Sequence, residues 1–116
     1  MEKLVSGIGG IFFRSKDNKG LAQWYEKHFG ISMVWEQEKG KTAFAPFKAD
    51  TDYFGNMNQQ FMINFRVTDI EKLVTQLQEA GVKIDENRMN DETYGKFAWV
   101  YDPEGNKIEL WEPVEN

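Results

Sequence analysis

One carboxylate near the C-terminus stands among aromatic and basic side chains at a spacing that could support chemistry. Residues 107–111 alternate like a strand, so Lys107, Glu109 and Trp111 are expected to share one face. A carboxylate among aromatic rings is costly to bury without a partner. We therefore expect Glu109 to be solvated, to pair with Lys107 or Arg66, or to meet a cation. Such a group could also act as a general base, provided that an oxyanion stabiliser lay nearby.

The other reactive residue types exclude several kinds of catalytic site. The sequence contains no cysteine, which excludes disulfides, zinc–thiolate sites and thiol nucleophiles. Its only histidine, His28, falls on the apolar stripe of a predicted helix. A lone histidine there is more often a packed, hydrogen-bonded core residue than a metal ligand. Ser6 and Ser15 have no base beside them in the sequence, so a nucleophilic triad is unsupported.

Composition and charge narrow the class of protein. A chain of 116 residues suits one domain, and 15% aromatic residues are an excess over an ordinary globular balance. The net charge of −5 disfavours nucleic acid as a partner. No apolar run approaches the roughly 20 residues that a membrane helix needs, and the N-terminus lacks the apolar core of a signal peptide. These features, with the absence of cysteine, predict a cytoplasmic protein.

A weak internal repeat divides the chain into two halves. Residues 11–17 resemble residues 63–69, and each stretch reads as a strand that leads into a helical pattern ending at a glycine. The segments after the helices also correspond, because residues 42–47 resemble residues 109–114. The predicted order is therefore strand, helix and strands, repeated once, which is an α+β pattern.

Helical periodicity supports both predicted helices. The first is expected to begin at a cap on Asp17 or Asn18 and to end at Gly30. Its apolar stripe at i, i+3, i+4, i+7 and i+8 comprises Leu21, Trp24, Tyr25, His28 and Phe29. In the second helix, Thr68 and Glu71 have capping-box spacing, and Gly81 is the predicted stop.

The C-terminal part of the sequence predicts a hairpin. Residues 97–101 and 107–111 read as strands, and the turn Asp-Pro-Glu-Gly-Asn at 102–106 joins them. Pairing across this turn should bring Trp99 beside Glu109.

Residues 48–60 form the longest stretch without periodicity and read as a connector between the halves. A connector of this length sometimes covers a cleft but is more often only a linker. The predicted division of the single domain 1–116 is a first module at about 5–48, a connector at about 49–60 and a second module at about 61–114.

Three segments together resemble the vicinal-oxygen-chelate superfamily, which includes glyoxalases, bleomycin-resistance proteins and dioxygenases. They are residues 10–31, residues 61–82 and the hairpin at 101–111, of which the hairpin is the most specific. The resemblance implies paired βαβββ modules that form a curved mixed sheet around a cleft, with the helices outside. It also implies a homodimer. The first half is short between residues 31 and 47, so its part of the sheet is expected to lack a strand.

The same resemblance implies where a metal would bind. Metal-dependent members use His, Gln or Glu from the first strand of each module and Glu from the last strand of each. These positions fall on Gly10, Met62, Thr42 and Glu109, of which only Glu109 carries a normal ligand. Catalytic zinc usually has three protein ligands. We therefore expect no cofactor and no intact metal site, and leave open a weak divalent metal at Glu109.

The expected cleft is aromatic and acidic, as ligand pockets often are. Its predicted ligand-contacting residues are Trp99, Met62, Asn64, Phe12, Phe97, Trp111 and Tyr101. The simpler alternative is that these aromatic residues pack as a second core.

Three functional hypotheses follow from this sequence. In the first, the protein binds a planar or cationic small molecule without a metal, as bleomycin-resistance proteins do. In the second, it is an enzyme of glyoxalase, isomerase or dioxygenase type, in which Glu109 is the catalytic base or part of a weak metal site. In the third, the inward aromatic residues only form a subunit interface.

Overall fold

A computed structural model describes residue 4 and residues 8–114, which form a mixed α+β fold. The elements in chain order are α1 (Asn18–Phe29), β1 (Ile63–Arg66), α2 (Ile70–Glu79), β2 (Lys83–Asp91), β3 (Gly95–Tyr101) and β4 (Lys107–Pro113). The four strands form one sheet in the order β1-β4-β3-β2. The β1–β4 pair is parallel and the other two pairs are antiparallel. The predicted fold class and mixed sheet are thus confirmed, although the sheet is open.

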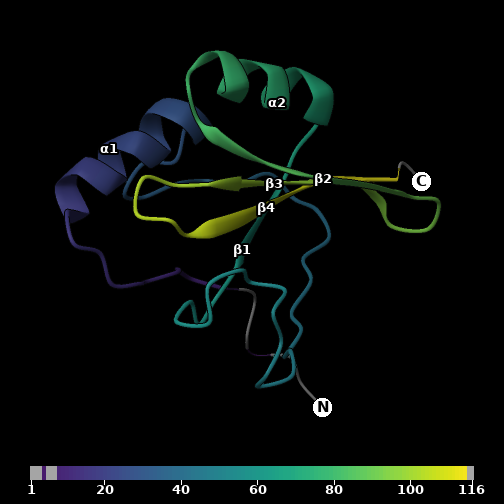
Figure 1. The fold of residues 1–116 in the computed structure, drawn as a ribbon, viewed down its shortest axis with the longest axis horizontal. Helices are drawn as coiled ribbons and strands as arrows, with labels where there is room; N and C mark the ends of the chain where they lie inside the picture. The colour runs from purple at the N-terminus through teal and green to yellow at the C-terminus, as the bar shows by residue number, and fades with distance from the viewer. Residues whose placement is uncertain (1–3, 5–7, 115–116) are drawn as a thin grey trace.

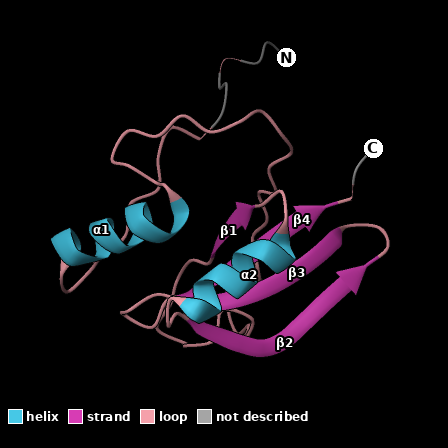
Figure 2. Ribbon diagram, turned by 90° about the horizontal axis from the view of Figure 1, so that it is seen from above, coloured by secondary structure: helices cyan, strands magenta, loops and turns pink. Residues whose placement is uncertain are grey.

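Both helices cover the same face of this sheet (Figures 1 and 2). Apolar side chains of β3 and β4 meet the helices there, and the fully buried ones include Val100, Ile108 and Leu110. The core cluster on the helix side consists of Leu21, Tyr25, Ile70, Val74 and Leu77. Since Ile108 and Leu110 face the helices, Glu109 between them faces the other side of the sheet, as the alternation predicts. None of the helices among the described residues has the length and apolar character needed to cross a bilayer.

The ends of both helices are stabilised locally. At the start of α1, Asp17 accepts a hydrogen bond from the backbone N–H of Gly20 at 3.0 Å, and the helix ends at Gly30 with φ of 70°. Both features confirm the sequence analysis. For α2 the capping-box prediction is wrong, because Asp69 rather than Thr68 is the N-cap and accepts from the backbone N–H of Lys72 at 3.1 Å. The helix begins one residue later than the box requires, so only the Asp69 side chain reaches that donor.

This capping arrangement predicts unequal effects for two adjacent substitutions. Asp69→Ala should lower the free energy of unfolding by about 1 kcal/mol, because it leaves a first-turn N–H without its acceptor. Thr68→Ala should change stability by less than about 0.5 kcal/mol. Urea denaturation followed by circular dichroism measures both values. A larger loss for Thr68→Ala than for Asp69→Ala would show that Thr68 caps the helix and that the capping-box prediction is correct.

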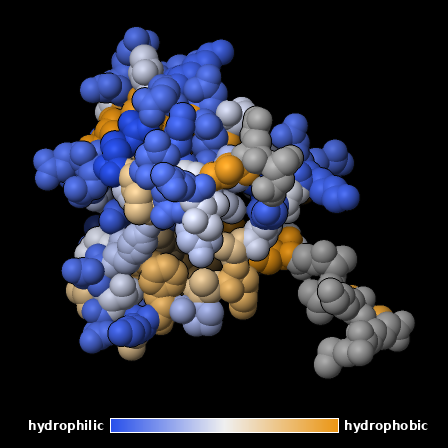
Figure 3. Space-filling model, turned by 90° about the vertical axis from the view of Figure 1, so that its right-hand side faces the viewer, coloured by the Kyte–Doolittle hydropathy of each residue, from blue (hydrophilic) through white to orange (hydrophobic). Residues whose placement is uncertain are grey.

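The first half of the chain departs most from expectation. Residues 11–17 and 42–47 read as strands in the sequence, yet no strand precedes β1 in the described part of the chain. A strand requires a hydrogen-bonded neighbour, and β1 stays at the edge of the sheet with neither segment paired to it. Large apolar side chains in this half are almost fully exposed, including Phe12, Met33 and Phe44. Figure 3 shows a group of moderately apolar side chains in the lower part of the view, with hydrophilic ones beside them.

The turn at 102–106 holds α1 as well as closing the hairpin. The buried Asp102 carboxylate accepts hydrogen bonds from the backbone N–H groups of Glu104 and Asn106, at 2.9 and 3.0 Å, and from the Asn106 side chain at 2.7 Å. It also accepts from the hydroxyl of Tyr25 on α1 at 2.8 Å. Burial first, and then the bond to Asp102, raises the pKa of Tyr25. One carboxylate therefore shapes the turn and positions the helix.

Glu104 in the same turn binds the segment that leads into α1. Its carboxylate accepts from the backbone N–H groups of Lys16 and Asp17, at 2.8 and 3.0 Å, and from the Ser15 hydroxyl at 2.7 Å. The Lys16 backbone bond is the main cause that lowers the pKa of Glu104 below its ordinary value of 4.5. A carboxyl whose pKa is depressed by folding stabilises the protein only while it is ionised.

The expected consequence is a pH dependence that Glu104→Gln removes. Wild type should be more stable than the variant above pH 4.5, the ordinary pKa of the group. The difference should shrink as the pH falls through the lower, folded-state pKa. Thermal unfolding of both proteins between neutral and acid pH measures it. A stability difference that stayed constant with pH would contradict the role of the ionised carboxylate.

Candidate functional site

The candidate site lies on the sheet face that the helices leave uncovered. Strand register places Glu109 on β4 between two partners, Asn64 on β1 and Trp99 on β3. In the next row along the sheet, Trp111 on β4 is the partner of Phe97 on β3. The predicted proximity of Trp99 and Glu109 across the hairpin is thus confirmed.

Glu109 is only 8% exposed and both of its oxygens are hydrogen-bonded. The Asn64 amide donates to Oε1 at 2.7 Å, and the Trp99 indole N–H donates to Oε2 at 2.9 Å. The hydroxyl of Tyr53 also donates to Oε2. These neutral donors compensate the loss of water around a buried carboxylate.

The basic residues expected to neutralise Glu109 bind elsewhere. The Lys107 ammonium donates to the backbone carbonyl of Tyr53 at 2.9 Å. The guanidinium of Arg66 donates to the carbonyls of Lys41 and, at 2.7 Å, of Glu38. The ion pair with either residue, one of the three environments expected for Glu109, is therefore not formed. The reason is that each cation is drawn to backbone oxygens of the extended chain between α1 and β1.

A row of nearly parallel aromatic rings continues from Trp99 across the sheet. The rings of Trp99 and Phe97 have centroids 6.4 Å apart and an interplanar angle of 14°. Those of Phe97 and Trp111 are 6.2 Å apart at 7°. Phe97 and Trp111 are half-buried, and the Trp111 indole N–H donates to the carbonyl of Tyr94 at 2.7 Å. This hydrogen bond and the strand backbones give the row a defined orientation.

Tyr53 is the functional candidate that sequence reasoning missed. It lies in the irregular connector, and its ring meets Trp99 edge-on with centroids 6.1 Å apart. The Lys107 ammonium lies 5.3 Å from the centroid of the Tyr53 ring, and Phe47 stacks on that ring at 5.5 Å. Burial, followed by the bond to Glu109, raises the pKa of Tyr53. The only signal in the sequence was an aromatic pair, Tyr53 and Phe54, inside a stretch otherwise rich in polar residues.

Comparison with known proteins identifies the family of this chain. The glyoxalase/bleomycin resistance protein/dioxygenase superfamily model matches residues 7–110. The chain belongs to this superfamily. The resemblance inferred from the sequence is therefore confirmed. No curated protein matches the chain.

Several solved structures share the fold. The chain is 24% identical to TnmS3, an antibiotic binding protein from Streptomyces sp. CB03234, with a TM-score of 0.67 over 97% of this chain and 100% of that one. It is 21% identical to glyoxalase I of Leishmania major, with a TM-score of 0.54 over 86% and 81% of the two chains. It is 19% identical to a virulence protein from Salmonella typhimurium, with a TM-score of 0.50 over 90% and 100%. At these identities the likeness concerns the fold alone.

A metal in a site of this superfamily needs a set of N and O ligands, and the described residues around Glu109 do not fit such a set. Glu109 is surrounded by the hydrogens of Tyr53, Asn64 and Trp99, all directed at its oxygens. A cation placed there would meet these same hydrogens. Within the residues described, no group of three or more His, Asp or Glu side chains could hold a metal ion. Glu109 thus acts as a hydrogen-bond acceptor that fixes Trp99 and Asn64 in place.

The remaining predicted contact residues divide into those near this face and those apart from it. Met62 is half-buried and directly precedes β1. Tyr101 pairs with Lys107 in the register, and its hydroxyl donates to Asp85 at 2.7 Å, which is the main cause that raises the pKa of Tyr101 to about 12. Phe12 is 90% exposed and lies in the extended N-terminal segment. The structure therefore does not bring Phe12 to the sheet face.

Three further sequence positions are placed by the structure. Gly10 and Thr42, two of the inherited metal positions, lie in exposed irregular chain. His28 is half-buried rather than part of the core, and its ring packs against Trp24 at 5.0 Å. The helix turns its Leu21 and Tyr25 stripe into the core and leaves His28 at the border. Ser6 lies outside the described residues.

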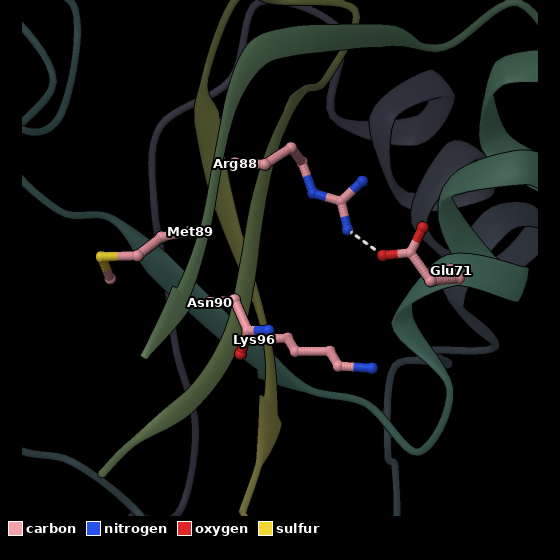
Figure 4. Close-up of a pocket in the computed structure, with 5 residues that line it drawn as sticks. All are labelled: Glu71, Arg88, Met89, Asn90 and Lys96. Atoms are coloured by element: carbon pink, nitrogen blue, oxygen red, sulfur yellow. Dashed lines mark hydrogen bonds and ion pairs between the residues drawn. The ribbon is translucent and has the colours of Figure 1, made fainter. Parts of the chain in front are cut away.

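The aromatic row is an open face in this chain, and the hollow in Figure 4 lies elsewhere. That hollow, of about 530 Å³, lies between the start of α2 and strands β2 and β3. Its cations are already paired, because Arg88 forms an ion pair with Glu71, and Lys96 lies 4.0 Å from Glu112. The Met89 side chain points away from these charged side chains (Figure 4). We regard this hollow as a solvated surface of paired charges, worth little to stability or recognition.

Proposed function

We propose that this superfamily member binds a planar aromatic small molecule on the sheet face opposite the helices, without a metal. The observation that carries the proposal is the row of Trp99, Phe97 and Trp111, whose rings are nearly parallel. Phe97 and Trp111 are partly accessible, and Trp99 is buried beside them. Aromatic rings add stacking energy to the burial of apolar area, so a flat ligand gains most from such a row. The similar fold of TnmS3, described as an antibiotic binding protein, supports the same class of function.

The environment of Glu109 favours a neutral ligand over a cationic one. Both oxygens already accept hydrogen bonds, so the carboxylate has little left to offer an ammonium group. While Tyr53 donates to Oε2, the carboxylate is also not free to act as the general base that the enzyme alternative requires. In this proposal Glu109 keeps the Trp99 ring in place, and the rings make the contact.

Calorimetric titration with two neutral planar probes, 2-naphthol and 2-methoxynaphthalene, tests the proposal. Phe97→Leu and Trp111→Leu keep apolar bulk but remove a ring, and each should weaken binding by about 3- to 10-fold. Arg88→Ala, in the hollow of paired charges, is the matched control and should leave affinity unchanged. Equal binding by wild type and both ring variants would place the ligand elsewhere and refute this site.

The exposed apolar surface of the first half supports a homodimer. Among the described residues, the edge of β1 has no neighbour on one side, and the strand-like sequences at 11–17 and 42–47 have no strand partner. A second copy would supply that partner and cover side chains such as Phe44. Light scattering should then give twice the chain mass of 13.6 kDa. A monomer at micromolar concentration would refute the dimer.

The proposal also covers the domain organisation of the chain and its cellular compartment. We regard the chain as one domain whose two modules, at about 5–48 and 61–114, are joined by the connector at about 49–60. A sequence without cysteine is compatible with the reducing cytoplasm.

A further inference from the structure

We propose that Tyr53 is an internal occupant of the binding site, and that the ligand displaces it with a hydroxyl-bearing aromatic ring of its own. This inference rests on the function proposed above and specifies the chemical class of the ligand. A phenol-like compound is expected, because the site already holds the phenol of a tyrosine.

The contacts of Tyr53 describe what such a ligand would gain. Its hydroxyl donates to Oε2 of Glu109, and its ring meets the Trp99 ring at an interplanar angle of 69°. The Lys107 ammonium lies within cation–π distance of both rings, at 5.3 Å from Tyr53 and 5.5 Å from Trp99. A hydroxylated aromatic ring in the same place would recover the hydrogen bond, the ring contact and the cation–π contact together.

Of the donors to Glu109, Tyr53 is the one that can leave. Asn64 and Trp99 belong to β1 and β3, where the backbone is held by neighbouring strands. Tyr53 belongs to the connector, which has no helix or strand between residues 48 and 62. Segments with few cooperative backbone bonds open at low cost compared with strands inside a sheet.

The connector also has an anchor that does not depend on Tyr53. The Gln59 side chain accepts from the backbone N–H of Lys107 at 2.8 Å and donates to the Lys107 carbonyl at 2.9 Å. Residues 52–59 form turns that are closed by their own backbone hydrogen bonds, from Gly55 N to Asp52 O at 3.0 Å and from Gln59 N to Asn56 O at 2.9 Å. Tyr53 can therefore move away from Glu109 while Gln59 keeps the connector on the sheet.

The requirement for a hydroxyl follows from the buried acceptor. When Tyr53 moves away, Oε2 of Glu109 keeps only the Trp99 donor. A ligand with an O–H restores the second bond, whereas its methyl ether leaves the carboxylate undersatisfied. A hydrogen bond to a charged group corresponds to a preference of about 10- to 100-fold for the hydroxylated compound.

Calorimetric titration of wild type and Tyr53→Phe with 2-naphthol and 2-methoxynaphthalene tests this inference. Removing the competing hydroxyl should tighten 2-naphthol binding about tenfold relative to wild type. Both proteins should prefer 2-naphthol to its methyl ether, and Glu109→Gln should reduce that preference. Tyr94→Phe removes an exposed tyrosine hydroxyl and keeps the backbone carbonyl that accepts from Trp111, so it is the matched control and should behave as wild type.

The outcomes separate this inference from the function on which it rests. If both probes bind wild type and Tyr53→Phe with the same affinities, the displacement of Tyr53 is refuted while the aromatic face remains a binding site. A preference for the methyl ether would also refute it. If neither probe binds either protein, the proposed function fails as well.

Discussion

Replacing Glu109 with alanine is expected to lower the free energy of unfolding by about 2–4 kcal/mol, since it removes the shared acceptor of Tyr53, Asn64 and Trp99. The most costly is the indole N–H of Trp99, whose side chain is 7% exposed and cannot turn to water. Chemical denaturation measures the loss. Tryptophan fluorescence of the folded variant should also change, because Trp99 loses the bond that fixes its ring.

Glu109→Gln is the control for this prediction. The amide keeps one oxygen as an acceptor but presents hydrogens to the remaining donors, so an intermediate loss of about 1–2 kcal/mol is expected. The opposing effect is the cost of burying a charge, which the alanine variant no longer carries. If Glu109→Ala were as stable as wild type, that cost would outweigh the hydrogen bonds, and Glu109 would be retained for function at no gain in stability.

Replacing Asp102 with alanine is expected to cost about 3 kcal/mol or more. The carboxylate is 4% exposed and accepts from two backbone N–H groups, one amide and the Tyr25 hydroxyl. Its loss removes the acceptor of the buried Tyr25 hydroxyl and of three partly buried donors, and breaks the link between the hairpin turn and α1. Urea denaturation monitored by circular dichroism measures the change.

Tyr25→Phe separates the two roles of Asp102. It removes the bond to α1 and leaves the turn intact, so a loss of about 1 kcal/mol is expected. A loss as large as that of Asp102→Ala would mean that the contact with α1, rather than the turn, accounts for the stability. A loss near zero in both variants would contradict the structural role of this carboxylate.

The three hydrogen bonds that Glu109 accepts change the role assigned to this residue in ligand binding. The sequence presented an acidic residue among aromatic ones, which invites a cation or a metal. The structure instead surrounds the carboxylate with neutral donors from Tyr53, Asn64 and Trp99. In the two proposals, the aromatic rings bind the ligand, and the carboxylate selects ligands whose hydroxyl donates a hydrogen bond to it. The two experiments with naphthalene probes test these two statements separately.

Local physics made much of the second half predictable. Alternation along residues 107–111 predicted which side chains face the helices, and the turn at 102–106 predicted the pairing of Trp99 with Glu109. The glycine at position 30 predicted the end of α1. Strand β2 was not predicted, because a bulge between Ile84 and Arg88 interrupts the alternation that identifies a strand.

Long-range contacts decided the rest. The sequence by itself determined the α+β class, the two helices and the face to which Glu109 belongs, since these follow from spacing and local hydrogen bonding. Its resemblance to known members indicated the superfamily. Only the tertiary structure decided what Glu109 contacts, because Tyr53 lies 56 positions away in a connector without periodicity. It also decided that residues 11–13 and 42–47 form no strand within this chain, because strand formation depends on a neighbouring edge rather than on the segment alone.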